Sequence, residues 1–375
     1  MRPSDSWREA ASAGHAPGEP SPHGEAMLRA YGLDRAVDYG MALDDMLRVD
    51  ARVRAGAGWA NVLEHLASDN LQRAEFQSGL GHASSASGFY LHAAACLRLA
   101  QAGCEEDLPQ RRTLYERQSI AFARGVSCSG LHAQPMAFSF RDATHQGWVV
   151  RPSAEDAPPP CVLVWGGADG WCEAFWRSVP SLLERGLAVC LVELPGQGLA
   201  RLRDGSYLRA DFTRFVSLVI DALGEAGLDS NRTAVVGHSM GGSLAMAAAG
   251  GDERIRACVN NGGVLERDAT DHFPRATRRV AAMLGPDADV GMFYASLALP
   301  TAARTMQADL LCVQGGKDVL VADAQARQAV ELRGAGHATL AYWPEGVHCI
   351  YNHALERNCL VADWLADKLG AARQG

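Results

Sequence analysis

A serine between two glycines follows a run of apolar residues in the second half of the chain. Residues 233–236 predict a buried strand, the pentapeptide Gly237-His238-Ser239-Met240-Gly241 follows it, and the small residues at 243–249 predict a helix. Glycines at both ends of the pentapeptide permit a sharp strand-to-helix turn that lifts the serine hydroxyl above the sheet, with the helix N-terminus beneath it. We interpret Ser239 as a candidate nucleophile. An ordinary glycine turn is the alternative, because the chain contains 39 glycines.

A serine hydroxyl needs a histidine as general base and a carboxylate that orients the histidine. Residues 310–314 predict a strand whose following loop carries Asp318, and residues 339–343 predict the next strand, which leads to His348. The chain order Ser, Asp, His after successive strands is that of the α/β-hydrolase fold. We therefore predict Asp318 and His348 as the partners of the serine. Three alternatives stay open: Asp318 as a helix N-cap, Asp323 as the orienting acid, and His348 as a surface residue.

Acyl transfer also requires hydrogen-bond donors for the oxyanion that develops on the substrate. The backbone N–H of Met240, directly after the candidate nucleophile, is one predicted donor. The loop at 165–170, Trp-Gly-Gly-Ala-Asp-Gly, predicts the second donor at Gly167 or Ala168, with a simple tight turn as the alternative. A further turn at 193–198, Glu-Leu-Pro-Gly-Gln-Gly, is interpreted as structural.

Two composition regimes indicate how these residues are positioned. Residues 1–25 are rich in Pro, Ser, Gly and Ala and predict a disordered leader, and residues 26–130 repeat apolar residues at helical spacing, which predicts a lid module of four or five helices. Residues 131–375 predict the catalytic domain, with a cap-like insertion at 264–307. After an antiparallel hairpin (136–141 and 146–151), fully apolar strands alternate with helices, which predicts a mostly parallel sheet covered on both faces. The strand candidates are 161–165, 188–193, 233–237, 257–261, 310–314 and 339–343; the helix candidates are 173–185, 211–226, 242–249, 322–332 and 351–369.

Composition excludes several classes of protein. The net charge is −8 and no Lys/Arg block is present, which argues against a nucleic-acid partner, and no apolar stretch is long enough to span a membrane. None of the ten cysteines forms a CxxC pair and several lie in apolar runs, which is typical of a reducing cytoplasm. The twelve histidines show no metal-binding spacing, so we expect neither a metal nor a cofactor. The expected partner is a small-molecule substrate; a homodimer is one possible assembly.

Several motifs occur together in an order that carries a family resemblance. The helical module, the loop Gly166-Gly167-Ala168-Asp169 with Glu173 close behind, the turn Pro195-Gly196-Gln197-Gly198 and the segment Gly237-His238-Ser239-Met240-Gly241-Gly242 follow one another. In this combination the chain resembles the α/β-hydrolases related to 2,6-dihydroxypseudooxynicotine hydrolase, to fungal polyketide-shortening hydrolases of the yellowish-green pigment type and to fermentation-respiration switch esterases. The resemblance covers roughly residues 26–369.

The resemblance implies a substrate cleft between the helical module and the hydrolase core, and cleavage of an ester or of a C–C bond next to a carbonyl. C–C cleaving members use an additional acid after the nucleophile strand, for which Glu266, Asp268 and Asp271 are open candidates. The predicted substrate-binding residues are Asp169, Trp171, Glu173, His238 and Glu266. We therefore predict a serine hydrolase acting on a bulky acyl, aromatic or polyketide-like molecule. An acyltransferase or cyclase with the same triad, a non-catalytic binding protein and a peptidase are the alternatives.

Overall fold

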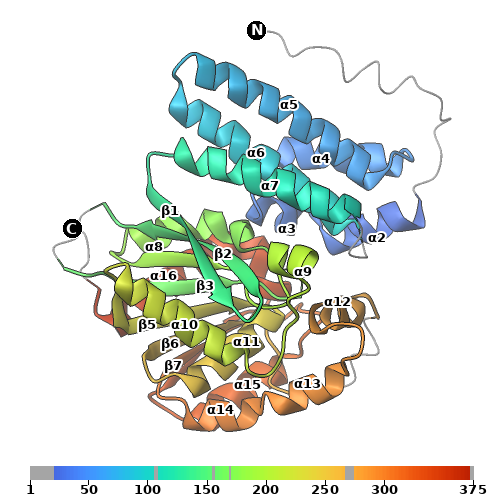
Figure 1. Cartoon of the computed structure of the whole chain (residues 1–375). Coiled ribbons are helices and arrows are strands. Elements are labelled where there is room, and N and C mark those ends of the chain that lie inside the picture. The colour runs from blue at the N-terminus through green and yellow to red at the C-terminus, as the bar shows by residue number, and fades with distance from the viewer. Residues whose placement is uncertain (1–20, 105–108, 154–156, 169, 267–273, 372–375) are drawn as a thin grey trace.

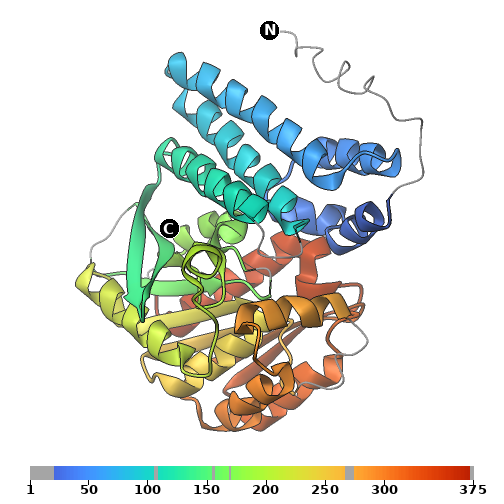
Figure 2. The same cartoon turned by 45° about the vertical axis from the view of Figure 1, so that its right-hand side comes forward.

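The computed structural model of the chain describes residues 21–104, 109–153, 157–168, 170–266 and 274–371. In both views a group of N-terminal helices lies over a layered unit in which helices cover a sheet (Figures 1 and 2). The chain order of the elements follows the predicted change from an all-helical region to alternating strands and helices. This confirms the predicted fold class, a mostly parallel α/β unit with an N-terminal helical module.

The helical module consists of six helices in the described residues. Their apolar residues recur at helical spacing and are buried, as Trp59, Val62 and Leu63 are in α5. The first helix starts at Pro22, since the Ser21 hydroxyl accepts a hydrogen bond from the Gly24 N–H and caps it. The expectation of a leader through residue 25 is therefore wrong for residues 22–25; residues 1–20 lie outside the described residues. The helices are α2 (Pro22–Ala30), α3 (Leu33–Asp38), α4 (Leu43–Arg54), α5 (Trp59–Gly79), α6 (Ala83–Ala102) and α7 (Pro109–Ser127).

Within the part of the chain that the structure describes, eight strands form one sheet in the order β1-β2-β4-β3-β5-β6-β7-β8. The first two pair antiparallel to each other and β2 pairs antiparallel to β4, whereas all other neighbours are parallel. The hairpin turn is tighter than predicted, because Phe140 pairs with Ala143 and Arg141 adopts a φ of 52°. The strands are β1 (His132–Phe140), β2 (Ala143–Arg151), β3 (Pro160–Trp165), β4 (Ala188–Val192), β5 (Asp229–His238), β6 (Ile255–Asn261), β7 (Asp309–Gly315) and β8 (Ala338–Trp343).

Both faces of the central strands are buried, which explains their uninterrupted apolar sequences. In β3, Val162 and Val164 join a core that continues into the helical module, while Leu163 and Trp165 point into a second core on the other face. Burying one such side chain contributes about 1.5–3 kcal/mol relative to its exposed state. The first core ties the helical module to the sheet through apolar packing.

Helices on the two faces complete the layers. Helices α8 and α16 pack together on one face, and α10, α11 and α15 lie on the other. The helix predicted over 173–185 is instead a 3-10 helix followed by a short α-helix; Pro180 lies in the first turn of the latter, where a missing N–H is tolerated. The elements are η1 (Cys172–Ser178), α8 (Val179–Leu183), α9 (Gly198–Asp204), α10 (Phe212–Glu225), α11 (Met240–Gly251), α15 (Asp323–Arg333), η3 (His348–His353) and α16 (Ala354–Leu369).

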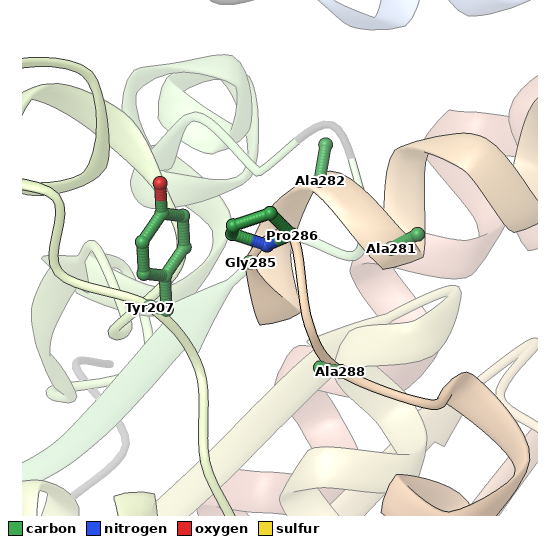
Figure 3. Close-up of a pocket in the computed structure, with 6 residues that line it drawn as sticks. All are labelled: Tyr207, Ala281, Ala282, Gly285, Pro286 and Ala288. Atoms are coloured by element: carbon green, nitrogen blue, oxygen red, sulfur yellow. The ribbon is translucent and has the colours of Figure 1, made fainter.

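In residues 264–266 and 274–307, the described part of the segment at 264–307, there are three short helices, α12 (Pro274–Leu284), α13 (Val290–Ser296) and α14 (Leu299–Thr305). Helix α14 packs against α11 and α15. A pocket of about 300 Å³ lies between α12 and the connection from α9 to α10, where Tyr207 faces Pro286 (Figure 3). None of its lining residues belongs to the predicted site. Among the helices that the structure describes, none is long and apolar enough to cross a membrane.

Candidate active site

The turn between β5 and α11 holds Ser239 at the carboxyl end of the sheet. The serine adopts φ 57° and ψ −133°, a left-handed backbone conformation that costs roughly 1–3 kcal/mol for a residue with a side chain. A Cβ atom at Gly237 would overlap the carbonyl oxygen of Gly241, so the reversal requires glycine there. The Ser239 N–H donates to the Asn261 carbonyl at the end of β6, which fixes the turn on its neighbouring strand. The sequence predicts this strained turn, and the structure places it there.

His348 lies within hydrogen-bond distance of both predicted partners. Its Nε2 is 2.9 Å from the Ser239 Oγ, and its Nδ1 is 2.8 Å from the Asp318 Oδ2. The second carboxylate oxygen of Asp318 accepts the N–H groups of Leu320 and Val321 at 2.8 and 3.0 Å. Only 1% of the Asp318 side chain is exposed. This arrangement holds the imidazole so that its Nδ1–H group donates a hydrogen bond to the carboxylate. Its Nε2 is then unprotonated and accepts the proton of the serine.

The surroundings of His348 set its basicity. Burial alone would lower the pKa of His348, but the adjacent Cys349 and Asp318 side chains outweigh burial and raise it above its usual value. The two residues after the histidine, Cys349 and Ile350, have φ values of 56° and 57° and buried side chains. A left-handed conformation is rare for a β-branched residue such as isoleucine. The loop is therefore held in place by contacts around it.

The loop after β3 packs directly on the nucleophile turn. A Cβ at Gly167 would lie 2.9 Å from both the Met240 nitrogen and the His238 carbonyl oxygen, so only glycine permits this approach. Ala168 is half-buried beside it. The loop after β3 and the Met240 nitrogen thus lie together beside Ser239, the place where donors to an oxyanion are needed.

Gln197 is a functional residue that sequence reasoning missed. Its Nε2 donates to the carbonyl oxygens of Gly166 and Gly167, at 2.8 and 3.0 Å, and its Oε1 accepts the Leu194 N–H. The turn at 193–198, interpreted as structural, therefore positions the predicted oxyanion loop. A glutamine between two glycines was the signal available in the sequence.

The predicted substrate-binding residues fall in different places. The ring of His238 stacks on Phe175, with centroids 4.2 Å apart, and its Nδ1 accepts a hydrogen bond from the Asn261 side chain. Its contacts are therefore inside the protein, and burial lowers its pKa. Trp171 is buried in the core that joins module and sheet. The backbone of Glu266 is anchored on Gln325 and the residue is exposed. Asp169, Asp268 and Asp271 lie outside the described residues.

Glu173 lines a cavity of about 710 Å³ between the helical module and η1. The walls of the cavity are aromatic and polar. In the wall, the Asp45 carboxylate lies 2.9 Å from the His92 Nε2. Burial opposes protonation of His92, but this contact outweighs burial and raises the pKa of His92 to about 10. No residue of the Ser239–His348–Asp318 set lines this cavity. The lining includes Tyr39, Phe89, His92, Arg98, Phe122, Glu173 and Trp176.

Three buried side chains come close enough together to be considered as metal ligands. One ligand atom each from Cys172, Glu173 and Glu193 lies within 4.8 Å of the others. Burial raises the pKa of all three, that of Glu193 to about 8. Because the protonated, neutral forms are favoured and cations bind the deprotonated forms, this donor set fits a metal ion poorly.

A family model described as the Alpha/beta hydrolase family matches residues 162–373, more than half of the chain. The chain therefore belongs to the α/β-hydrolase family and is a hydrolase. The 2,6-dihydropseudooxynicotine hydrolase of Paenarthrobacter nicotinovorans is 24% identical over 341 residues, which cover 89% of this chain and 91% of that protein. The hydrolase acrC of Aspergillus aculeatus is 39% identical over 107 residues, 27% of this chain and 25% of that protein.

Solved structures show the same fold. The structure of 2,6-dihydroxy-pseudo-oxynicotine hydrolase superposes with a TM-score of 0.79 at 24% identity, covering 90% of this chain and 95% of that one. AbyA5 superposes with a TM-score of 0.62 at 19% identity, covering 82% and 89%. Both likenesses extend into the helical module, because the matched share exceeds the α/β unit alone. They show the shared fold, and together with the family match and the relatives above they bear out the resemblance predicted from the motifs.

Proposed function

We propose that this chain is a serine hydrolase that cleaves an ester, or a C–C bond next to a carbonyl, through an acyl-enzyme. The observation that carries the proposal is the continuous hydrogen-bonded line from the Ser239 Oγ through both ring nitrogens of His348 to the Asp318 carboxylate. Such a line makes a serine nucleophilic at neutral pH.

In the proposed reaction Ser239 attacks the substrate carbonyl carbon while the His348 Nε2 takes its proton. The oxyanion receives hydrogen bonds from the Met240 N–H and from the Gly167–Ala168 segment. His348 then donates the proton to the leaving group, and the acyl group remains on the serine oxygen. A water molecule, deprotonated by the same histidine, attacks the acyl carbon and releases a carboxylic acid and the free serine. Asp318 stabilises the imidazolium in both halves.

The cavity beside η1 supports a bulky, oxygen-bearing aromatic substrate. Its volume of about 710 Å³ lies in the range of small-molecule sites, and aromatic rings alternate there with Arg98 and Glu173. Tyr39 lines the cavity and its hydroxyl lies 3.0 Å from that of Tyr351, whose ring packs on the His348 imidazole. Two tyrosine side chains in contact thus lie between the cavity and the proposed general base. A relative named for a pseudooxynicotine substrate is consistent with this class of molecule.

C–C cleavage differs from ester cleavage in its leaving group, a carbanion or enolate that must be protonated. Glu266, an open candidate for that acid, is exposed. The imidazolium of His348, formed in the first half-reaction, supplies a proton in either case. We therefore propose the two bond types as one mechanism with different leaving groups.

The experiment is a panel of p-nitrophenyl esters and aryl β-diketones, with the products identified by mass spectrometry and Ser239→Ala as the matched control. Release of a carboxylic acid from either class, absent in the variant, supports the proposal. Turnover of neither class, or turnover that survives in the variant, argues against it.

We further propose a reducing, cytoplasmic compartment and a small-molecule substrate as the only partner that catalysis needs. All ten cysteines are free, and seven of them are buried. Cysteine used as a small apolar residue is typical of such a compartment. Thiol titration of the denatured protein purified from cytoplasm should find ten reactive thiols; fewer would point to disulfides.

A further inference from the structure

The loop that carries His348 is fixed by a buried charge from the helical module. Cys349 and Ile350, the strained residues directly after the histidine, bring the Cys349 carbonyl oxygen into the protein interior. That oxygen accepts two hydrogen bonds, from the Arg357 Nη1 at 3.0 Å and from the Asn261 Nδ2 at 3.2 Å. An unusual backbone conformation persists where surrounding contacts determine it. The two donors are such contacts.

The guanidinium of Arg357 is itself held by Asp38, the last residue of α3. Both carboxylate oxygens of Asp38 accept from the guanidinium, each at 3.0 Å, and the side chains are 8% and 3% exposed. This fork-to-fork pairing fixes the direction of the guanidinium as well as its charge. Since α3 belongs to the helical module and α16 to the α/β unit, the pair spans the two parts of the molecule.

Neighbouring contacts reinforce the same junction. The residue after Asp38 is Tyr39, whose ring meets Tyr351 edge-on with centroids 5.6 Å apart, in addition to the contact between their hydroxyls. The Val37 carbonyl accepts from Arg177 of η1 at 2.7 Å. The end of α3 is therefore seated against both η3 and η1.

We propose that Asp38 and Arg357 are positioning residues, through which the helical module holds His348 in line with Ser239. This inference rests on the proposed function, since it assigns His348 the role of general base. The helical module then has two tasks: it encloses the cavity, and its docking completes the catalytic geometry. Neither residue touches the reacting atoms; both act through the Cys349 carbonyl.

The central test compares Asp38→Asn with the wild type, using p-nitrophenyl acetate, a small ester that does not need the large cavity. Asparagine keeps the shape of aspartate but loses the charge and one acceptor. Because a catalytic group misplaced by about 1 Å can cost about 100-fold in rate, we expect kcat to fall about 10- to 100-fold with KM nearly unchanged. Asp38→Glu, which retains a carboxylate, should recover part of the loss.

The pH profile separates positioning from mere stability. The titratable groups nearest to His348 in the described residues are Asp318, Cys349, Tyr351 and His238. Asp38→Asn leaves all four in place but removes the counter-charge of Arg357, and an uncompensated positive charge itself lowers the pKa of a nearby histidine. A shift of the kcat/KM midpoint toward lower pH therefore reports a looser contact between His348 and Asp318 only if it is also found in a variant that lacks both charges. The control is Asp363→Asn, which removes a carboxylate from α16, the helix that carries Arg357; there Asp363 pairs with Arg185 at 2.6 Å. It should leave the rate and the midpoint unchanged.

A second variant keeps the test valid if Asp38→Asn fails to fold with Arg357 left unpaired. The double variant Asp38→Leu/Arg357→Met replaces both charges with apolar side chains of similar volume, a change that buried ion pairs often tolerate. It should fold and lose kcat at least about tenfold, because the Cys349 carbonyl has lost one of its two donors and keeps only Asn261. Wild-type kcat and midpoint in both folded variants, measured beside an inactive Ser239→Ala, would overturn the positioning role alone. An active Ser239→Ala would instead overturn the proposed function.

Discussion

Replacing Asp318 with asparagine is the substitution whose consequence the geometry defines most closely. The carboxylate uses one oxygen for the His348 Nδ1 and the other for the Leu320 and Val321 N–H groups. Asparagine has a single acceptor oxygen. If this oxygen keeps the hydrogen bonds from the Leu320 and Val321 N–H groups, the side-chain NH₂ faces the His348 Nδ1. The NH₂ group can only donate, so the imidazole proton is forced onto Nε2.

That tautomer cannot accept the proton of Ser239, because Nε2 lies only 2.9 Å from the serine oxygen and now carries a hydrogen. The same exchange in a Ser-His-Asp enzyme lowers kcat by about 10⁴. This corresponds to a barrier higher by about 5 kcal/mol. We expect a loss of that order here, with a small change in KM, since Asp318 is buried behind the histidine.

The assay is steady-state hydrolysis of a p-nitrophenyl ester, with circular dichroism to show that the variant is folded. Asp323→Asn is the matched control: its carboxylate is exposed, pairs with Arg327 four residues on in the same helix, and should change kcat less than about twofold. A loss smaller than about tenfold for Asp318→Asn would refute the reasoning. A large loss for Asp323→Asn would assign the orienting role to that residue instead.

Three further outcomes are expected. The kcat/KM of the wild type should rise with pH to a midpoint above 6.5, because only neutral His348 accepts a proton and its pKa is raised; a flat profile between pH 6 and 9 contradicts this. Gly167→Ala should lower kcat about 10²- to 10³-fold, because the methyl group would crowd the Met240 N–H, and should also lower the melting temperature, because the methyl group would press on the backbone of the nucleophile turn; a wild-type rate excludes that donor. Glu193→Gln should change how the free energy of unfolding depends on pH. Burial raises the pKa of Glu193 in the folded protein to about 8, above its unfolded value. The contribution of Glu193 to the free energy of unfolding is therefore fully present at low pH and is lost as the pH rises from about 4.5 to 8. Urea unfolding should show the variant gaining about 1.4 kcal/mol per pH unit over the wild type in that range, and parallel profiles count against it.

Much of the α/β unit was predictable because its strands are buried on both faces. A strand such as β3 has no polar alternation, so its apolar run stands out between glycine and proline turns. The order of Ser239, Asp318 and His348 along the chain then predicted that three distant residues meet at one edge of the sheet, since parallel strands end together. The structure brings the His348 imidazole within 3 Å of both the Ser239 hydroxyl and the Asp318 carboxylate.

The features that the sequence did not predict depend on contacts between residues far apart in the chain. Asp38 and Arg357 are 319 positions apart, and neither lies in a motif that indicates its partner. The helix predicted from residue 351 begins at Ala354, because the left-handed residues Cys349 and Ile350 precede it. The orientation of His238 toward Phe175, away from a substrate role, likewise depends on η1 packing over the nucleophile turn.

The most direct measurement of the central claim is intact-protein and peptide mass spectrometry after treatment with a fluorophosphonate. We predict one adduct per chain, on the peptide that contains Ser239, and no adduct on the folded Ser239→Ala variant. An adduct on another residue, or labelling that persists in Ser239→Ala, would contradict the assignment of the nucleophile.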